Sequence, residues 1–113
     1  MTEQLVRTNG VDLCVETFGD KGNPAILLIM GAGASMVDWD AEFCLRLADA
    51  ARFVIRYDHR DTGRSVSYPA GTPPYALRDL LDDAVGLLDA YELPRAHIVG
   101  MSMGAAIGQL MAL

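Results

Sequence analysis

Five residues near the end of the chain, Gly100-Met101-Ser102-Met103-Gly104, have types and spacing suited to nucleophilic chemistry. A glycine-x-serine-x-glycine turn between a strand and a helix is so tight that it holds the serine hydroxyl clear of the sheet. The serine backbone is strained there, and side chains two residues either side would collide with the neighbouring strand and helix. We therefore predict Ser102 as a catalytic nucleophile, with Gly100 and Gly104 as the elbow glycines.

The residues on either side of this pattern are needed to support the prediction, because so short a pattern also arises by chance. An apolar stretch, Ala96 to Val99, precedes it, and small and apolar residues from Ala105 to Leu113 follow it. The alternative interpretation is a serine that only caps an ordinary helix. A serine hydroxyl is also a poor nucleophile until a base takes its proton, so the prediction requires a base.

The elements that must position Ser102 follow from the hydrophobic pattern. Two strands around the Asn9-Gly10 turn predict a leading antiparallel hairpin. Continuous apolar runs predict strands buried on both faces. A helix is predicted from an N-cap at Asp38, with Trp39 on its apolar face. The predicted strands are 4–8, 11–18, 25–30, 52–57 and 97–100; the later helices are 75–91 and one that begins at the elbow; 58–74 is a loop.

Strands separated by crossover helices imply an α/β fold with a mostly parallel sheet and helices on both faces. The loops at the carboxyl ends of such strands carry the chemistry. Three loops have this place: 31–35, 58–65 and the elbow. At 113 residues, the chain is at most one domain.

Three motifs, in this order, resemble the α/β-hydrolase fold family and within it an esterase-like subgroup. Met30-Gly31-Ala32-Gly33 stands where the family has its oxyanion loop, commonly His-Gly-x-x. The run from Asp58 to Ser65 matches the pattern D-x-R-G-x-G-x-S, with Asp61 in place of the commoner glycine, and the elbow comes third. The run from Arg56 to Ser65 and the elbow are similar to bacterial methylesterases of the aclacinomycin methylesterase type, which act on polyketide methyl esters. Because the motifs cover nearly the whole chain, residues 1–113 are predicted to form an incomplete domain, the N-terminal strands through the elbow.

The resemblance also implies roles for main-chain groups. The N–H of Met103 is the first expected oxyanion donor, since it follows the nucleophile at a helix N-terminus. The second expected donor is the N–H of Ala32, with Gly31 as the neighbouring alternative. Because both donors are main-chain groups, Met30 in place of histidine leaves them intact. The 58–65 loop is expected to be structural, with Asp58 and Ser65 bonding turn amides and Gly63 supplying a positive φ.

Neither histidine is expected to be the catalytic base. His59 and His97 both precede Ser102, whereas the family order is serine, then acid, then histidine. The two histidines lie 38 residues apart in sequence without matching cysteines or acids, so no metal site is predicted. No cofactor is implied, because the chain has neither a G-x-G-x-x-G pattern after a strand nor a P-loop lysine.

The charge and the cysteine content of the chain limit the classes of partner that we expect. A net charge of −6 argues against nucleic acid and anionic membranes, and the apolar tail 98–113 is too short and too glycine-rich for a membrane span. Cys14 and Cys44 sit among apolar residues like reduced thiols, and the first residues lack the pattern of a signal peptide. We therefore expect a cytoplasmic protein with a small-molecule ester as its substrate.

Two functions follow. The first is a serine hydrolase that acts on a carboxylic ester through an acyl-enzyme, active only as part of a longer chain that supplies the acid and the base. The alternative is a catalytically inactive truncated fragment, or a binding or association module. Serine at position 102 argues against epoxide hydrolases and dehalogenases, which place aspartate there; peptidases, thioesterases, cofactor-free haloperoxidases and acyltransferases remain open.

A chain that holds only the N-terminal part of this fold is expected to have incomplete packing. The last strand is expected to be an unpaired edge. One face of the final helix, with Ile107, Leu110 and Met111, is expected to lack a partner. The 113 residues alone are expected to aggregate, self-associate or form a molten state.

Overall fold

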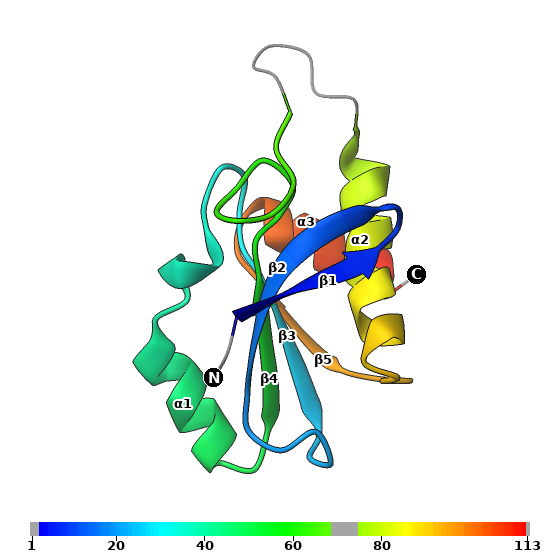
Figure 1. The fold of residues 1–113 in the computed structure, drawn as a ribbon. Helices are drawn as coiled ribbons and strands as arrows, with labels where there is room; N and C mark the ends of the chain where they lie inside the picture. The colour runs from blue at the N-terminus through cyan, green and yellow to red at the C-terminus, as the bar shows by residue number, and fades with distance from the viewer. Residues whose placement is uncertain (1–2, 69–74, 113) are drawn as a thin grey trace.

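The computed structural model describes residues 3–68 and 75–112, and it confirms the α/β architecture (Figure 1). Residues 69–74 of the predicted loop and Leu113 lie outside the described residues. Most predicted boundaries hold within one or two residues. The strands are β1 (Glu3–Thr8), β2 (Val11–Phe18), β3 (Ala25–Ile29), β4 (Phe53–Tyr57) and β5 (His97–Gly100); the helices are α1 (Ala41–Asp49), α2 (Leu77–Ala90) and α3 (Met103–Met111), with a 3₁₀ turn η1 (Met36–Asp38).

The five strands form one sheet in the order β1-β2-β4-β3-β5. The predicted hairpin is present, since β1 and β2 are antiparallel around Asn9 and Gly10, whose φ angles are 50° and 80°. Strand β2 also pairs antiparallel with β4, whereas β4, β3 and β5 run parallel. The carboxyl ends of these three parallel strands therefore meet at one edge of the sheet, where the three predicted loops begin.

Helices cover both faces of the sheet, as predicted. Helices α2 and α3 pack together on one face, and α1 lies on the other (Figure 1). Alternate residues of β3 point to opposite faces: Leu27 and Ile29 join the cluster under α2 and α3, while Ile26 and Leu28 join the cluster under α1. Strand β3, which lies between β4 and β5, is thus buried on both faces.

The predicted start of the first helix at Asp38 is wrong. The chain instead makes the 3₁₀ turn η1, which Ser35 caps by accepting a hydrogen bond from the Val37 amide at 3.3 Å. Helix α1 begins after Asp40, whose carboxylate accepts from the Glu42 amide at 3.2 Å. Trp39 therefore precedes the helix, and it is buried there rather than on the helical face.

The free edge of the sheet is confirmed, but one part of the prediction about α3 is wrong. In the part of the chain that the structure describes, β5 pairs with β3 alone, and Val99 is 40% exposed. Ile107, however, is fully buried, because α3 packs its side chain into the core under α2, and Met111 is half-buried against the same core cluster. Leu110 stays 37% exposed, as expected. No helix in the described ranges is long and apolar enough to cross a membrane.

Candidate active site

Ser102 lies on the sharp turn that joins β5 to α3. Its backbone has φ 55° and ψ −115°, and its side chain makes no capping bond to the helix. A positive φ is costly for a residue with a Cβ, on the order of 1–3 kcal/mol, and such strain persists only where the surrounding structure enforces it. The residue is exposed at the carboxyl edge of the sheet. The serine is thus strained, accessible and free of a structural capping role.

The two elbow glycines lie where a side chain cannot fit. A Cβ on Gly104 would lie 2.1 Å from the carbonyl oxygen of Ile29, and a Cβ on Gly100 would lie 2.3 Å from the carbonyl oxygen of Gly104. Both obstacles are backbone atoms, which cannot rotate away. The absence of these two side chains lets the first turn of α3 lie directly against β3.

The loop from Met30 to Ser35 lies beside the serine. A Cβ on Gly31 would be 3.4 Å from the Ser102 Cβ and 3.2 Å from the Met101 carbonyl oxygen. The Met101 amide donates to the Ile29 carbonyl at 3.1 Å, which joins the elbow to the end of β3. Residues 70 to 72 apart along the chain therefore form one compact edge, as the order of the strands requires.

Several main-chain N–H groups in this edge, among them those of Ala32 and Met103, have no acceptor in the part of the chain that the structure describes. Within residues 3–68 and 75–112, the amides of Ala32 and Met103 make no hydrogen bond, whereas the next amides of α3 bond back to Met101 and Ser102 at 2.9 Å. Ala32 is exposed and Met103 is half-buried. The first amide of a helix carries part of the positive end of the helix dipole. Free amides of this kind can hold a negatively charged oxygen.

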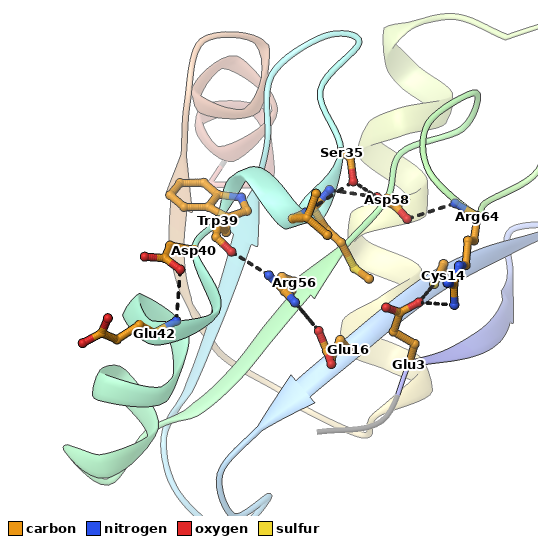
Figure 2. A network of polar contacts seen from close by, with 12 residues as sticks. Glu3, Cys14, Glu16, Ser35, Trp39, Asp40, Glu42, Arg56, Asp58 and Arg64 are labelled. Carbon is orange, nitrogen blue, oxygen red and sulfur yellow. Dashed lines mark hydrogen bonds and ion pairs between the residues drawn. The ribbon is translucent and has the colours of Figure 1, made fainter.

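The Asp58 carboxylate organises the neighbouring loops (Figure 2). It accepts hydrogen bonds from the Met36 amide at 2.8 Å, the Ser35 hydroxyl at 3.1 Å and the Arg64 amide at 3.1 Å. A Cβ on Gly63, which has φ 48°, would lie 2.1 Å from this carboxylate. The structural role predicted for the 58–65 loop is confirmed.

Ser65 and Asp61 complete that loop. The Ser65 hydroxyl donates to the Asp58 carbonyl at 2.6 Å and accepts from the Cys14 amide at 2.7 Å. Asp61 has φ 65°, which explains why glycine suits this position, and aspartate is among the residues that tolerate it. Its carboxylate accepts from the Tyr68 amide at 2.7 Å and the Tyr75 hydroxyl at 2.8 Å.

The two histidines lie in different places, and neither contacts Ser102 through a hydrogen bond in the described residues. His59 is 3% exposed, and its Nε2 lies 2.9 Å from the Met30 carbonyl oxygen. Burial lowers the pKa of His59, partly offset by the Met30 bond and by the Asp83 and Asp58 charges. His97 is exposed at the opposite end of β5, in the wall of a hollow of about 410 Å³.

Two buried ion pairs join residues whose partners the sequence did not identify, although the arginines of the 58–65 loop were expected to pair with acids. Arg56 bonds the Glu16 carboxylate through Nε at 2.9 Å and also through Nη2, and its Nη1 donates to the Trp39 carbonyl at 2.6 Å (Figure 2). Arg56 thus fixes the chain just after η1. The other pair, Arg60 with Asp83, is bidentate at 2.8 and 2.9 Å and fixes the 58–65 loop to α2.

Fold and site together define a strand-turn-helix serine at the carboxyl end of the parallel strands of a mixed sheet, which is the arrangement of the α/β-hydrolase fold. The chain belongs to that family: its family model, described as alpha/beta hydrolase fold, matches residues 24–113. In the described residues, no cluster of three or more His, Cys, Asp or Glu side chains could hold a metal ion.

Relatives agree with the predicted resemblance to bacterial methylesterases. The chain is 47% identical over 113 residues to rhodomycin D methylesterase DauP of Streptomyces sp. (strain C5), and 44% identical to rhodomycin D methylesterase DnrP of Streptomyces peucetius. All of this chain and 38% of each relative are covered. Epoxide hydrolase A from Mycobacterium thermoresistibile has a similar structure, with a TM-score of 0.88 and 32% identity over 99% of this chain and 34% of that one. The chain thus spans well under half the length of these relatives.

Proposed function

We propose that Ser102 is the nucleophile of a serine hydrolase that acts on a carboxylic ester, and that the active unit is a longer chain containing residues 1–113. The observation that carries the proposal is the strained, exposed serine on the turn after β5, directly beside the 30–35 loop. The methylesterase relatives support an ester as the substrate.

The chemistry assigned to these residues is acyl transfer. The Ser102 hydroxyl attacks the ester carbonyl while a base outside residues 1–113 takes its proton. The carbonyl oxygen becomes an oxyanion that accepts hydrogen bonds from the Met103 and Ala32 amides. The alcohol leaves with a proton from the same base, and water then hydrolyses the acyl-enzyme. Gly100 and Gly104 permit the turn that brings the hydroxyl and the Met103 amide to the same point.

A serine nucleophile separates this proposal from the epoxide hydrolase alternative. Opening an epoxide through a covalent intermediate uses a carboxylate nucleophile in that branch of the family, and residue 102 has only a hydroxyl. The free, buried thiols of Cys14 and Cys44 fit the reducing environment of a cytoplasmic enzyme.

The test uses the full-length form, meaning residues 1–113 with whatever follows them in the reading frame. We expect it to hydrolyse methyl esters of carboxylic acids and to be labelled by a fluorophosphonate probe. Ser102→Ala should lose at least about 10³-fold in kcat and all labelling. Ser67→Ala is the matched control, since Ser67 is an exposed loop serine. Unchanged labelling of Ser102→Ala would remove the nucleophile assignment.

The free edge of β5 favours a second candidate, a catalytically inactive fragment that associates through this edge. A hollow of about 620 Å³ lies beside it, walled by Ile98 and Gly100 of the strand region and by Ala105 and Met111 of α3. The DNA after codon 113 separates the two candidates. An in-frame acid and histidine that continue the fold support the hydrolase, whereas a stop codon and a concentration-dependent increase in mass of the 113-residue chain support association.

A further inference from the structure

His59 makes a buried contact that the proposed chemistry does not use. Its ring is 3% exposed, packs edge-on against Tyr57 at 5.2 Å between centroids, and has Nε2 2.9 Å from the Met30 carbonyl oxygen. A carbonyl oxygen only accepts, so Nε2 carries the proton. The Nδ1 atom is buried and has no hydrogen-bond partner among the described residues. The ring is therefore oriented by its one bond to the main chain of Met30.

The Met30 carbonyl belongs to the peptide that opens the 30–35 loop. A Cβ on Gly104 would lie 2.9 Å from this oxygen, so the first turn of α3 also lies close to it. The next residue, Gly31, lies against Met101 and Ser102. Rotating the Met30–Gly31 peptide would leave a buried carbonyl without its donor, a loss of about 1–3 kcal/mol, so the bond holds this peptide in one orientation.

The other end of the loop is held from the same strand. Asp58, the residue before His59, accepts from the Ser35 hydroxyl and the Met36 amide. The consecutive residues Asp58 and His59 thus bond the two ends of the 30–35 loop. Between the two contacts lies the Ala32 amide, which has no acceptor in the part of the chain that the structure describes.

We propose that His59 is a positioning residue: by donating to the Met30 carbonyl, it fixes the loop so that the Ala32 amide faces the oxygen that forms at Ser102. The inference rests on the proposed function for the role of Ala32, but the contact itself does not. His59 acts through the loop backbone and not as a base, because its second ring nitrogen is buried.

Two substitutions at His59 separate the hydrogen bond from the filling of space. His59→Phe keeps a ring without a donor, and His59→Gln supplies an amide N–H with a similar reach. Tyr57→Phe is the matched control, since it removes a neighbouring buried hydroxyl that has no partner in the described residues. All variants are made in the full-length form and first compared by thermal unfolding.

Steady-state ester hydrolysis is the first readout. We expect His59→Phe to lower kcat about 10- to 100-fold with KM changed less than about threefold, as for a displaced catalytic group. His59→Gln should recover most of the lost kcat. It should also leave unchanged the acid limb of the pH profile, which is the range where kcat falls as the pH is lowered. A kcat for His59→Phe within twofold of the Tyr57→Phe value would overturn the inference, and so would a shifted acid limb in His59→Gln.

Amide hydrogen exchange of the 30–35 peptide is the second readout, and it needs no activity. Exchange should speed up at least tenfold in His59→Phe and stay unchanged in His59→Gln and Tyr57→Phe. Unchanged exchange in His59→Phe overturns the inference whatever the activity. The two claims can fail separately. If ester hydrolysis survives Ser102→Ala, the proposed function is contradicted. If exchange is nevertheless faster in His59→Phe, the contact of His59 with the 30–35 loop is still supported.

Discussion

Adding one methyl group to Gly104 should damage the fold far more than adding one to Gly108, although both glycines lie in α3. The new Cβ at Gly104 would meet the Ile29 carbonyl oxygen at 2.1 Å and the Met30 carbonyl oxygen at 2.9 Å. Both are backbone atoms at the carboxyl end of β3. At Gly108 the nearest atom is a side-chain methyl of Ile98, at 2.9 Å.

The size of the effect follows from what must move. At Gly104, α3 must retreat from β3 by more than 1 Å to reach ordinary contact distance. Overpacking of this kind costs about 1–3 kcal/mol, and here it also separates the elbow from β3. Alanine gains up to about 1 kcal/mol over glycine inside a helix, which offsets part of this cost. At Gly108 the Ile98 side chain can shift, so the helical gain should leave the net change near zero.

Equilibrium urea unfolding of the full-length form measures both variants. We expect Gly104→Ala to lower the free energy of unfolding by about 1–2 kcal/mol relative to Gly108→Ala, at unchanged m-value. The same variant should lose ester hydrolysis, because the Met103 amide moves with the first turn of α3. Equal stabilities for the two variants would refute the close approach of α3 to β3.

Three further outcomes are expected. Asp83→Ala should destabilise the fold by about 3–5 kcal/mol in urea unfolding, because it leaves Arg60 buried without its partner, and a loss below about 1 kcal/mol would contradict this. Burial and Glu3 raise the pKa of Cys14 to about 11, so iodoacetamide at pH 8 should alkylate it at least tenfold more slowly than in urea; equal rates would refute its burial as a thiol. Burial lowers the folded-state pKa of His59, against the charges of Asp58 and Asp83, so the unfolded chain takes up the proton first. Stability should therefore fall as the pH drops below about 6.5, and His59→Phe should flatten this dependence.

The sequence predicted the hairpin, the buried strands and the elbow, because residues close together in the chain determine each of them. Asn9-Gly10 predicted the hairpin because both residues adopt the positive φ that its turn requires. The buried strands followed from continuous apolar runs, and the elbow followed from its glycines. The sequence therefore also placed Ser102, Ala32 and Met103 at one edge of the sheet, since the carboxyl ends of parallel strands meet there.

Contacts between distant residues account for what the sequence could not predict. The helix start moved from Asp38 to Asp40 because the Asp58 carboxylate, from another strand, holds Ser35 and the Met36 amide and so shapes η1. The buried pair of Arg56 with Glu16 joins residues 40 apart, which no spacing rule reveals. Ile107 gave no sign of burial, because its partners come from the packing of α3 under α2.

A crystal structure of the full-length form, solved after reaction with a methyl alkylphosphonofluoridate from which Ser102 displaces fluoride, would decide whether the elbow works as proposed. The phosphorus should be bonded to Ser102 Oγ, with one phosphonyl oxygen within about 3.1 Å of both the Met103 and the Ala32 nitrogen atoms. Phosphorus on another residue, or a phosphonyl oxygen that contacts neither amide, would contradict the assignment of this edge as the active site.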